Sequence, residues 1–182
     1  MLDLNITPEA QSTVLRKQAA GVSLRRRGLF KFECYDKYGN KKWEAEAENG
    51  STTEGLNHIL DTEFHGSSQE STWYIGLIDN SGFTEFVVAD TLLSHAGWTA
   101  LTDYTGDRKE WTEGASVAGS ITNASTVNFA MTATKTVKGA FLCSAATGLS
   151  SVILFCTAAF TGGTQAVENG DTLKVTYTIT IA

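Results

Sequence analysis

Apolar and polar residues alternate along much of the chain, which is the period of a β-strand with one buried face. The pattern is cleanest in residues 172–181, where apolar residues take every second position and Lys or Thr fills the others. A similar alternation begins at Leu29 and resumes after the turn-forming residues 36–40. These two segments predict a β-hairpin with one solvated face, whose outward charges discourage pairing with other sheets.

Further short apolar segments, separated by Gly, Asn, Ser and Asp, predict more strands. We expect them at residues 73–78, 98–104, 116–123, 126–132, 136–144 and 150–157. Residues 89–96 are compatible with one helical turn or an irregular loop. Eight or nine strands predict an all-β fold, an antiparallel β-sandwich of the jelly-roll or immunoglobulin-like kind with one short helix and an extended N-terminal arm.

One segment has a helical period instead. Residues 52–64 place Leu56, Ile59, Leu60 and Phe64 near every 3.6 positions, and a glycine follows at position 66. This pattern predicts an amphipathic helix that ends near Gly66. We expect its apolar face to lie across the sheet, leaving the opposite, polar face in water.

The length and the charge distribution predict two parts. A chain of 182 residues suits a single core, which we assign to residues 29–182, with residues 1–28 as an N-terminal arm. Residues 1–42 carry nine basic and four acidic side chains, whereas residues 43–182 carry five and sixteen. A basic arm on an acidic body is typical of a protein that docks on a surface. The candidate docking residues are Arg16, Lys17, Arg25, Arg26 and Arg27.

The composition also excludes several classes of protein. The chain has no apolar run of the length that a membrane-spanning helix needs and no visible secretory signal, so we expect it to stay where it is made, without a membrane partner. Cys34, Cys143 and Cys156 are odd in number and widely spaced. We therefore expect free, buried thiols rather than disulfides or a zinc site.

The histidines are the first place to look for catalysis or metal binding. Glu54, His58, Asp61 and His65 fall along one side of the predicted helix, but no HExxH-type spacing is present, and a solvated polar face explains them more simply. His95 follows a serine, yet no GxSxG motif occurs, and neighbours in sequence rarely form a catalytic pair. The prediction is a protein that is not an enzyme, with no metal and no cofactor.

Two binding functions deserve comparison with that prediction. Three consecutive arginines form a weak electrostatic footprint on an otherwise acidic body, so we expect no nucleic acid partner. Four tryptophans could form a sugar-binding platform, but in a sandwich of this size they are more often core residues or interface anchors. They are Trp43, Trp73, Trp98 and Trp111.

Five motifs, in order, resemble a family of small virion proteins encoded in the structural gene blocks of tailed phages. They are residues 32–43 (FECYDKYGNKKW), 53–60 (TEGLNHIL), 73–77 (WYIGL), 90–98 (DTLLSHAGW) and 170–175 (GDTLKV). The resemblance covers the chain from about residue 30 to its end, while the N-terminal extension departs from the family pattern.

The resemblance implies a capsid cement or decoration protein, assembled in the bacterial cytoplasm and located on the head surface of the virion. Its expected partners are the major capsid protein and other copies of itself, as a homo-oligomer on the capsid. Such a subunit needs many modest contacts whose avidity accumulates over a lattice. A tail or head-fibre component and a carbohydrate-binding module of the virion stay as alternatives.

Overall fold

The computed structural model describes residues 26–181, and these form antiparallel β-strands with one short helix. This confirms the predicted all-β, sandwich-like fold. The predicted arm, with Arg16, Lys17 and Arg25, lies almost wholly outside the described residues. The division of the chain at residue 28 therefore stays a prediction.

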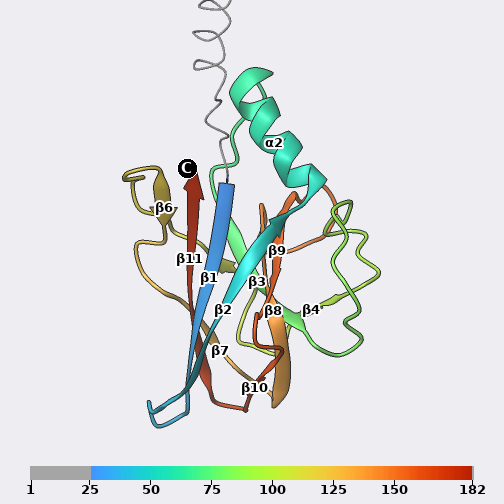
Figure 1. Cartoon of the computed structure of the whole chain (residues 1–182). Helices are drawn as coiled ribbons and strands as arrows, with labels where there is room; N and C mark the ends of the chain where they lie inside the picture. The colour runs from blue at the N-terminus through green and yellow to red at the C-terminus, as the bar shows by residue number, and fades with distance from the viewer. Residues whose placement is uncertain (1–25, 182) are drawn as a thin grey trace, which may run out of the picture.

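The strands form two layers, which share one strand (Figure 1). The first layer contains β1 (Arg26–Tyr35), β2 (Lys41–Ser51), β6 (Ser120–Thr122), β7 (Val127–Ala130) and β11 (Thr172–Ile181). The second contains β3 (Tyr74–Asp79), β4 (Thr99–Leu101), β5 (Lys109–Glu110), β8 (Lys135–Cys143), β9 (Leu154–Ala159) and β10 (Gln165–Val167). The last residues of β2 pair with β9 and so connect the layers, giving the order β4-β3-β8-β9-β2-β1-β11-β6.

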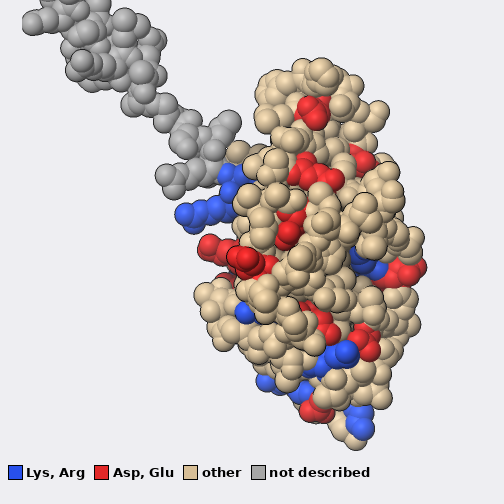
Figure 2. All heavy atoms as spheres, turned by 90° about the vertical axis from the view of Figure 1, so that its right-hand side faces the viewer, with Lys and Arg blue, Asp and Glu red and all other residues tan. Residues whose placement is uncertain are grey.

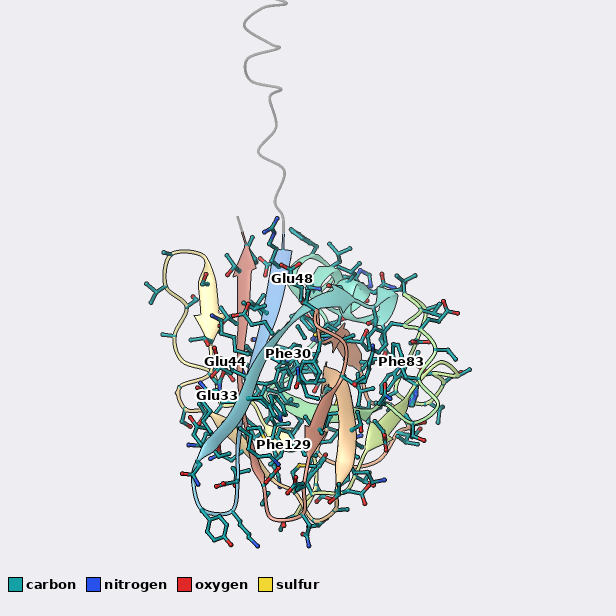
Figure 3. The ribbon with its side chains drawn as sticks, turned by 60° about the horizontal axis from the view of Figure 1, so that its bottom comes forward. Phe30, Glu33, Glu44, Glu48, Phe83 and Phe129 are labelled. Carbon is teal, nitrogen blue, oxygen red and sulfur yellow. The ribbon has the colours of Figure 1, made fainter. Side chains whose placement is uncertain are left out.

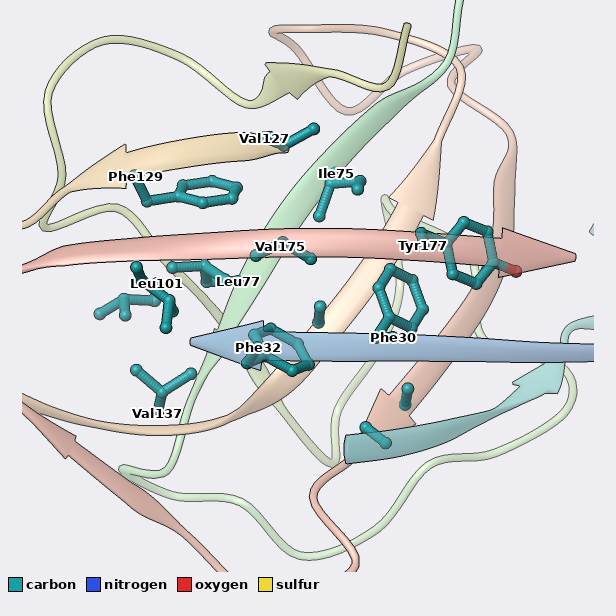
Figure 4. Packing of buried hydrophobic residues seen from close by; sticks show 14 of the residues in the cluster. Phe30, Phe32, Ile75, Leu77, Leu101, Val127, Phe129, Val137, Val175 and Tyr177 are labelled. Atoms are coloured by element: carbon teal, nitrogen blue, oxygen red, sulfur yellow. The ribbon is translucent and has the colours of Figure 1, made fainter. Parts of the chain in front are cut away.

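The core lies between the layers, and strand alternation decides which side chains enter it (Figure 4). Phe30 of β1 pairs with Tyr177 of β11, and their rings stack with centroids 3.9 Å apart. Two residues along, Phe32 pairs with Val175, and all four side chains are buried. Burial of each such side chain contributes about 1.5–3 kcal/mol before entropy is subtracted.

The outer face of the β1–β2 hairpin is charged, as the alternation predicts (Figure 3). Lys41 Nζ lies 2.7 Å from Glu33 Oε1, and this hydrogen bond lowers the pKa of Glu33. Lys31 Nζ lies 3.1 Å from Glu46 Oε1. Because these groups are exposed, each ion pair adds little stability, and their main effect is to keep this face soluble.

The predicted helix exists, but its predicted position is wrong. α2 (Thr53–Phe64) begins after the N-cap Thr52, whose Oγ1 accepts a hydrogen bond of 3.0 Å from Gly55 N. Instead of crossing the sheet, α2 stands at one end of the sandwich, where β1 begins and β11 ends (Figure 1). The backbone N–H of Leu154 donates to Glu54 Oε2 at 2.8 Å and helps to attach the helix to β9.

The structure contains two short strands that the sequence did not predict, and it decides between a helical turn and a loop for residues 89–96. β5 and β10 have two and three residues, too few for an alternation to be visible. Residues 89–96 form a loop and not a helical turn. Asp90 organises this loop, because its Oδ2 accepts hydrogen bonds of 3.0 Å from Val87 N and from Trp98 Nε1.

Candidate protein-docking surface

The outward side of α2 is apolar. Leu56, Leu60 and Phe64 follow one another at intervals of four residues, so they lie along one side of the helix. Their exposed fractions are 47%, 55% and 80%. We call these three residues the outer stripe. Its exposure contradicts the expectation that this face packs on the sheet, and contiguous exposed apolar side chains mark interaction surfaces.

Gly55 explains why the helix is oriented in this way. It is the buried residue of α2, and a Cβ at this position would lie 2.3 Å from the carbonyl oxygen of Phe155. The helix backbone can therefore approach β9 closely only on the side of Gly55. At 100° per residue, Leu60 and Phe64 lie on the side of the helix opposite Gly55, and Leu56 lies on its flank. The side chain of Phe64, in the last turn, also borders the space between the helix and the sandwich.

The polar side of α2 is correspondingly closer to the body than the sequence indicated. His58 is half-buried, and its ring meets Trp73 edge to face with centroids 5.5 Å apart. Glu54, on the same side, holds the backbone of β9. The predicted solvated side is therefore confirmed for Asp61 and His65, which are exposed, but not for Glu54 and His58, which pack against the body.

Between α2 and the end of the sandwich lies a cavity of about 480 Å³, which we call the α2 groove. Most of its lining is apolar. It includes Ile59 and Phe64 of the helix, Trp73, Trp111, Leu142 and Phe155 of the body, and Ile179 and Ile181 at the end of β11. Two polar side chains beside it, Thr62 and Arg26, have buried atoms without a hydrogen-bond partner among the described residues: Thr62 Oγ1 and both terminal nitrogens of Arg26.

The two candidate docking arginines that the structure describes have different surroundings. Arg26 points inward, with its guanidinium 4.5 Å from the centroid of the Phe155 ring. Arg27, the next residue on the strand, is exposed. Adjacent strand residues face opposite sides, so these two arginines cannot form one basic patch. Across the end of the molecule, α2 itself carries three acidic residues and neither Lys nor Arg.

The end of the molecule that carries α2 is mostly uncharged on the face shown in Figure 2. Acidic side chains are scattered among the uncharged ones there. Together with the outer stripe, this describes a surface that fits another protein with apolar side chains and some basic groups around them.

His95 has a structural environment. Its ring stacks on Trp98 with centroids 3.9 Å apart, and Nδ1 lies 2.9 Å from the carbonyl oxygen of Trp98. The neighbouring Ser94 bonds through its backbone N–H to Thr91 Oγ1, at 3.1 Å. Together with the hydrogen bonds of Asp90, these contacts give the motif of residues 90–98 a structural role: they hold the conformation of this loop.

No group of three or more His, Cys, Asp or Glu residues that could hold a metal ion occurs within residues 26–181. The absence of enzymatic activity and of a cofactor stays a prediction. In the same range, no helix is long and apolar enough to cross a membrane.

The three cysteines are free and buried, as predicted. Burial raises the pKa of the Cys34 thiol to about 12, helped by Asp171, whose Oδ2 accepts a hydrogen bond of 3.6 Å from Cys34 Sγ. Burial likewise raises the pKa of Cys143 to about 11 and raises the pKa of Cys156. Thiols that stay protonated near neutral pH are weak nucleophiles and weak metal ligands.

Two of the four tryptophans belong to the core. Trp98 and Trp111 are each 3% exposed, and Trp111 Nε1 donates a hydrogen bond of 3.2 Å to the carbonyl oxygen of Tyr177. Trp43 and Trp73 are partly buried, and Trp43 Nε1 donates to the carbonyl oxygen of Ala166 at 2.8 Å. The tryptophans therefore contribute mainly to packing.

No protein-family model matches the chain, and no curated protein matches it significantly in sequence. The likeness to virion proteins of tailed phages therefore depends on the five sequence motifs. Sequence reasoning missed this candidate docking surface, although it found the spacing of Leu56, Leu60 and Phe64. The sequence feature that could have revealed this surface is Gly55, because a residue without a side chain allows the helix to approach the body closely on that side.

Proposed function

We propose that this chain is a structural protein of a tailed-phage virion, which binds the outer surface of the head and stabilises the lattice of the major capsid protein. The observation that supports this most is the outer stripe of Leu56, Leu60 and Phe64, three large apolar side chains exposed at one end of a well-packed β body. The five phage-like motifs point to the same class of protein.

The outer stripe is the contact that we assign to the shell. Apolar side chains of the capsid protein would cover Leu56, Leu60 and Phe64, and basic groups around them would face Asp61 and Glu63, which are exposed on the same helix. Each contact is small, so attachment gains strength from the many copies of the site on the lattice. Truncation of a central anchor in an interface of this kind typically costs 2 kcal/mol or more.

The test is rebinding of purified protein to heads from which it has been removed. The wild-type chain should cosediment with such heads and raise the temperature at which they break. Leu60→Asp places a charge in the outer stripe and should weaken binding by about tenfold to a hundredfold. Val117→Asp is the matched control, because Val117 is 73% exposed and lies outside α2.

Three outcomes would reject parts of the proposal. If the wild-type chain does not associate with heads, the cement function is wrong. If antibody labels only the tail of intact virions, the chain belongs to the tail. If Leu60→Asp and Val117→Asp bind equally well, the outer stripe is not the contact.

A further inference from the structure

The α2 groove is a mostly apolar cavity with one wall formed by α2 and the other by the end of the sandwich. Ile59 and Phe64 come from the helix, and Phe155, Ile179 and Ile181 come from the strands beneath it. Apolar walls of this kind are stabilised when apolar side chains fill the space between them. The occupant should also bring hydrogen-bond acceptors, because the terminal nitrogens of Arg26 lack partners among the described residues.

The chain enters β1 beside this groove. Arg26, the first residue of β1, pairs with Ile181, and its guanidinium lies over the ring of Phe155. Both partners belong to the groove wall. Twenty-five residues precede Arg26, so the nearest of them are joined covalently to the edge of the cavity. Attachment at such short range corresponds to an effective concentration of about millimolar or more.

The period of β1 identifies which residues would enter. Phe30, Gly28 and Arg26 occupy the inner face of the strand. In the sequence, Leu24 and then Val22 stand at the two-residue spacing that continues backward from Arg26. Both are apolar and strand-compatible, and the backbone carbonyls beside them can accept hydrogen bonds from the guanidinium of Arg26.

Charge agrees with this assignment. Residues 1–25 contain Arg16, Lys17 and Arg25 against Asp3 and Glu9, and the three basic residues are the ones nearer to β1. The helix that forms the other wall of the groove carries Glu54, Asp61 and Glu63 and has no basic residue in its last turn. A segment that brings basic groups to this helix is therefore favoured over a second copy of α2, whose carboxylates would repel those of the first.

We propose that Val22 and Leu24 of the same chain occupy the α2 groove and fasten α2 to the sandwich. Leu56 and Leu60 of the outer stripe do not line the groove and stay free, while Phe64 borders it. The inference does not rest on the proposed binding to phage heads, because it concerns the isolated protein.

The test is chemical cross-linking in the full-length chain. In the double variant Leu24→Cys with Ile59→Cys, a short bismaleimide should join the two new thiols within one chain. Cys34, Cys143 and Cys156 are buried and protonated, so they react slowly and leave the signal clear. In the control, Leu24→Cys with Tyr38→Cys, the second thiol lies in the turn at the opposite end of β1, where Tyr38 is 79% exposed.

The expected yield of intrachain product, measured by mass spectrometry at dilute protein concentration, exceeds that of the control by about tenfold or more. Links formed only between chains carrying different mass labels would overturn the proposal and assign the groove to a neighbouring copy. Equal yields in the two double variants would overturn it as well and leave the groove to another partner.

A second measurement does not require two thiols to lie within reach of a cross-linker. Leu24→Asp should raise the fluorescence of an added apolar dye, since the groove walls become accessible, while Val14→Asp in the same segment should not. An unchanged signal in Leu24→Asp would overturn the proposal. Neither measurement uses phage heads, so failure of head binding and failure of this inference give separate results.

Discussion

The interior between β1 and β11 and the outer side of α2 contain the same kinds of residue in opposite environments. Phe30, Phe32 and Tyr177 are fully or almost fully buried and packed against one another. Leu60 and Phe64 of α2 are mostly exposed. Large apolar side chains therefore occur in two environments in this molecule: those buried in the core stabilise the fold, whereas those exposed on α2 form the surface that we propose for a partner.

The sharpest test of this difference is a pair of phenylalanine truncations. Phe30→Ala should lower the free energy of unfolding by about 3–5 kcal/mol, because it removes a stacked, fully buried ring. Phe64→Ala should change it by no more than about 0.5 kcal/mol, since that ring is exposed. Urea unfolding followed by circular dichroism measures both. Similar losses in the two variants would show that Phe64 belongs to the core.

Gly55 controls the orientation of α2, so an added methyl group should disturb it. Gly55→Ala should destabilise the protein by about 1–3 kcal/mol, because the new Cβ meets the backbone of Phe155 and the helix must move away from β9. Gly50→Ala is the control, since a Cβ there meets no atom within 4 Å. Thermal unfolding distinguishes the two. Equal stability of both variants would contradict the close contact at Gly55.

The buried thiols predict that the core loses stability at alkaline pH. Their pKa is higher in the folded protein than in the unfolded chain, so the unfolded state loses its protons first as the pH rises. The stabilisation that the protonated thiols give to the folded state is complete below about pH 9. It decreases as the pH rises from about 9 to the pKa of the folded protein, which is about 11 for Cys143 and about 12 for Cys34. The slope is about 1.4 kcal/mol per pH unit for each thiol.

Urea unfolding at pH 7, 9 and 10.5 measures this decline. Cys143→Ala should make the decline shallower, because one titrating group is removed. A wild-type stability that does not change over this range would contradict the predicted titration.

The smallest expected effect on stability is that of a charge in the outer stripe. Leu60→Asp should change the free energy of unfolding by no more than about 0.5 kcal/mol, because Leu60 is 55% exposed. Chemical unfolding of the isolated variant provides the measurement. A large loss would mean that the weaker head binding expected of this variant results from unfolding and not from a lost contact.

Much of the sandwich could be predicted from local pattern. The final strand has the bounds that its alternation indicated, Thr172–Ile181, and the hairpin of β1 and β2 has its predicted buried and charged faces. β5 and β10 could not be predicted in this way, since strands of two or three residues exist only through their hydrogen bonds to β3 and β8. The candidate docking surface was missed for a related reason, because burial of a helix face depends on the neighbours of the helix.

The sequence by itself determined which residues share a face. A strand places every second side chain on one side, and a helix aligns residues four apart, whatever surrounds them. Only the tertiary structure decided which face is buried. At α2 the decision depends on the close approach of Gly55 to the backbone of Phe155, two residues that lie 100 positions apart in the chain. No local periodicity contains that contact, and it turns a predicted core face into an exposed one.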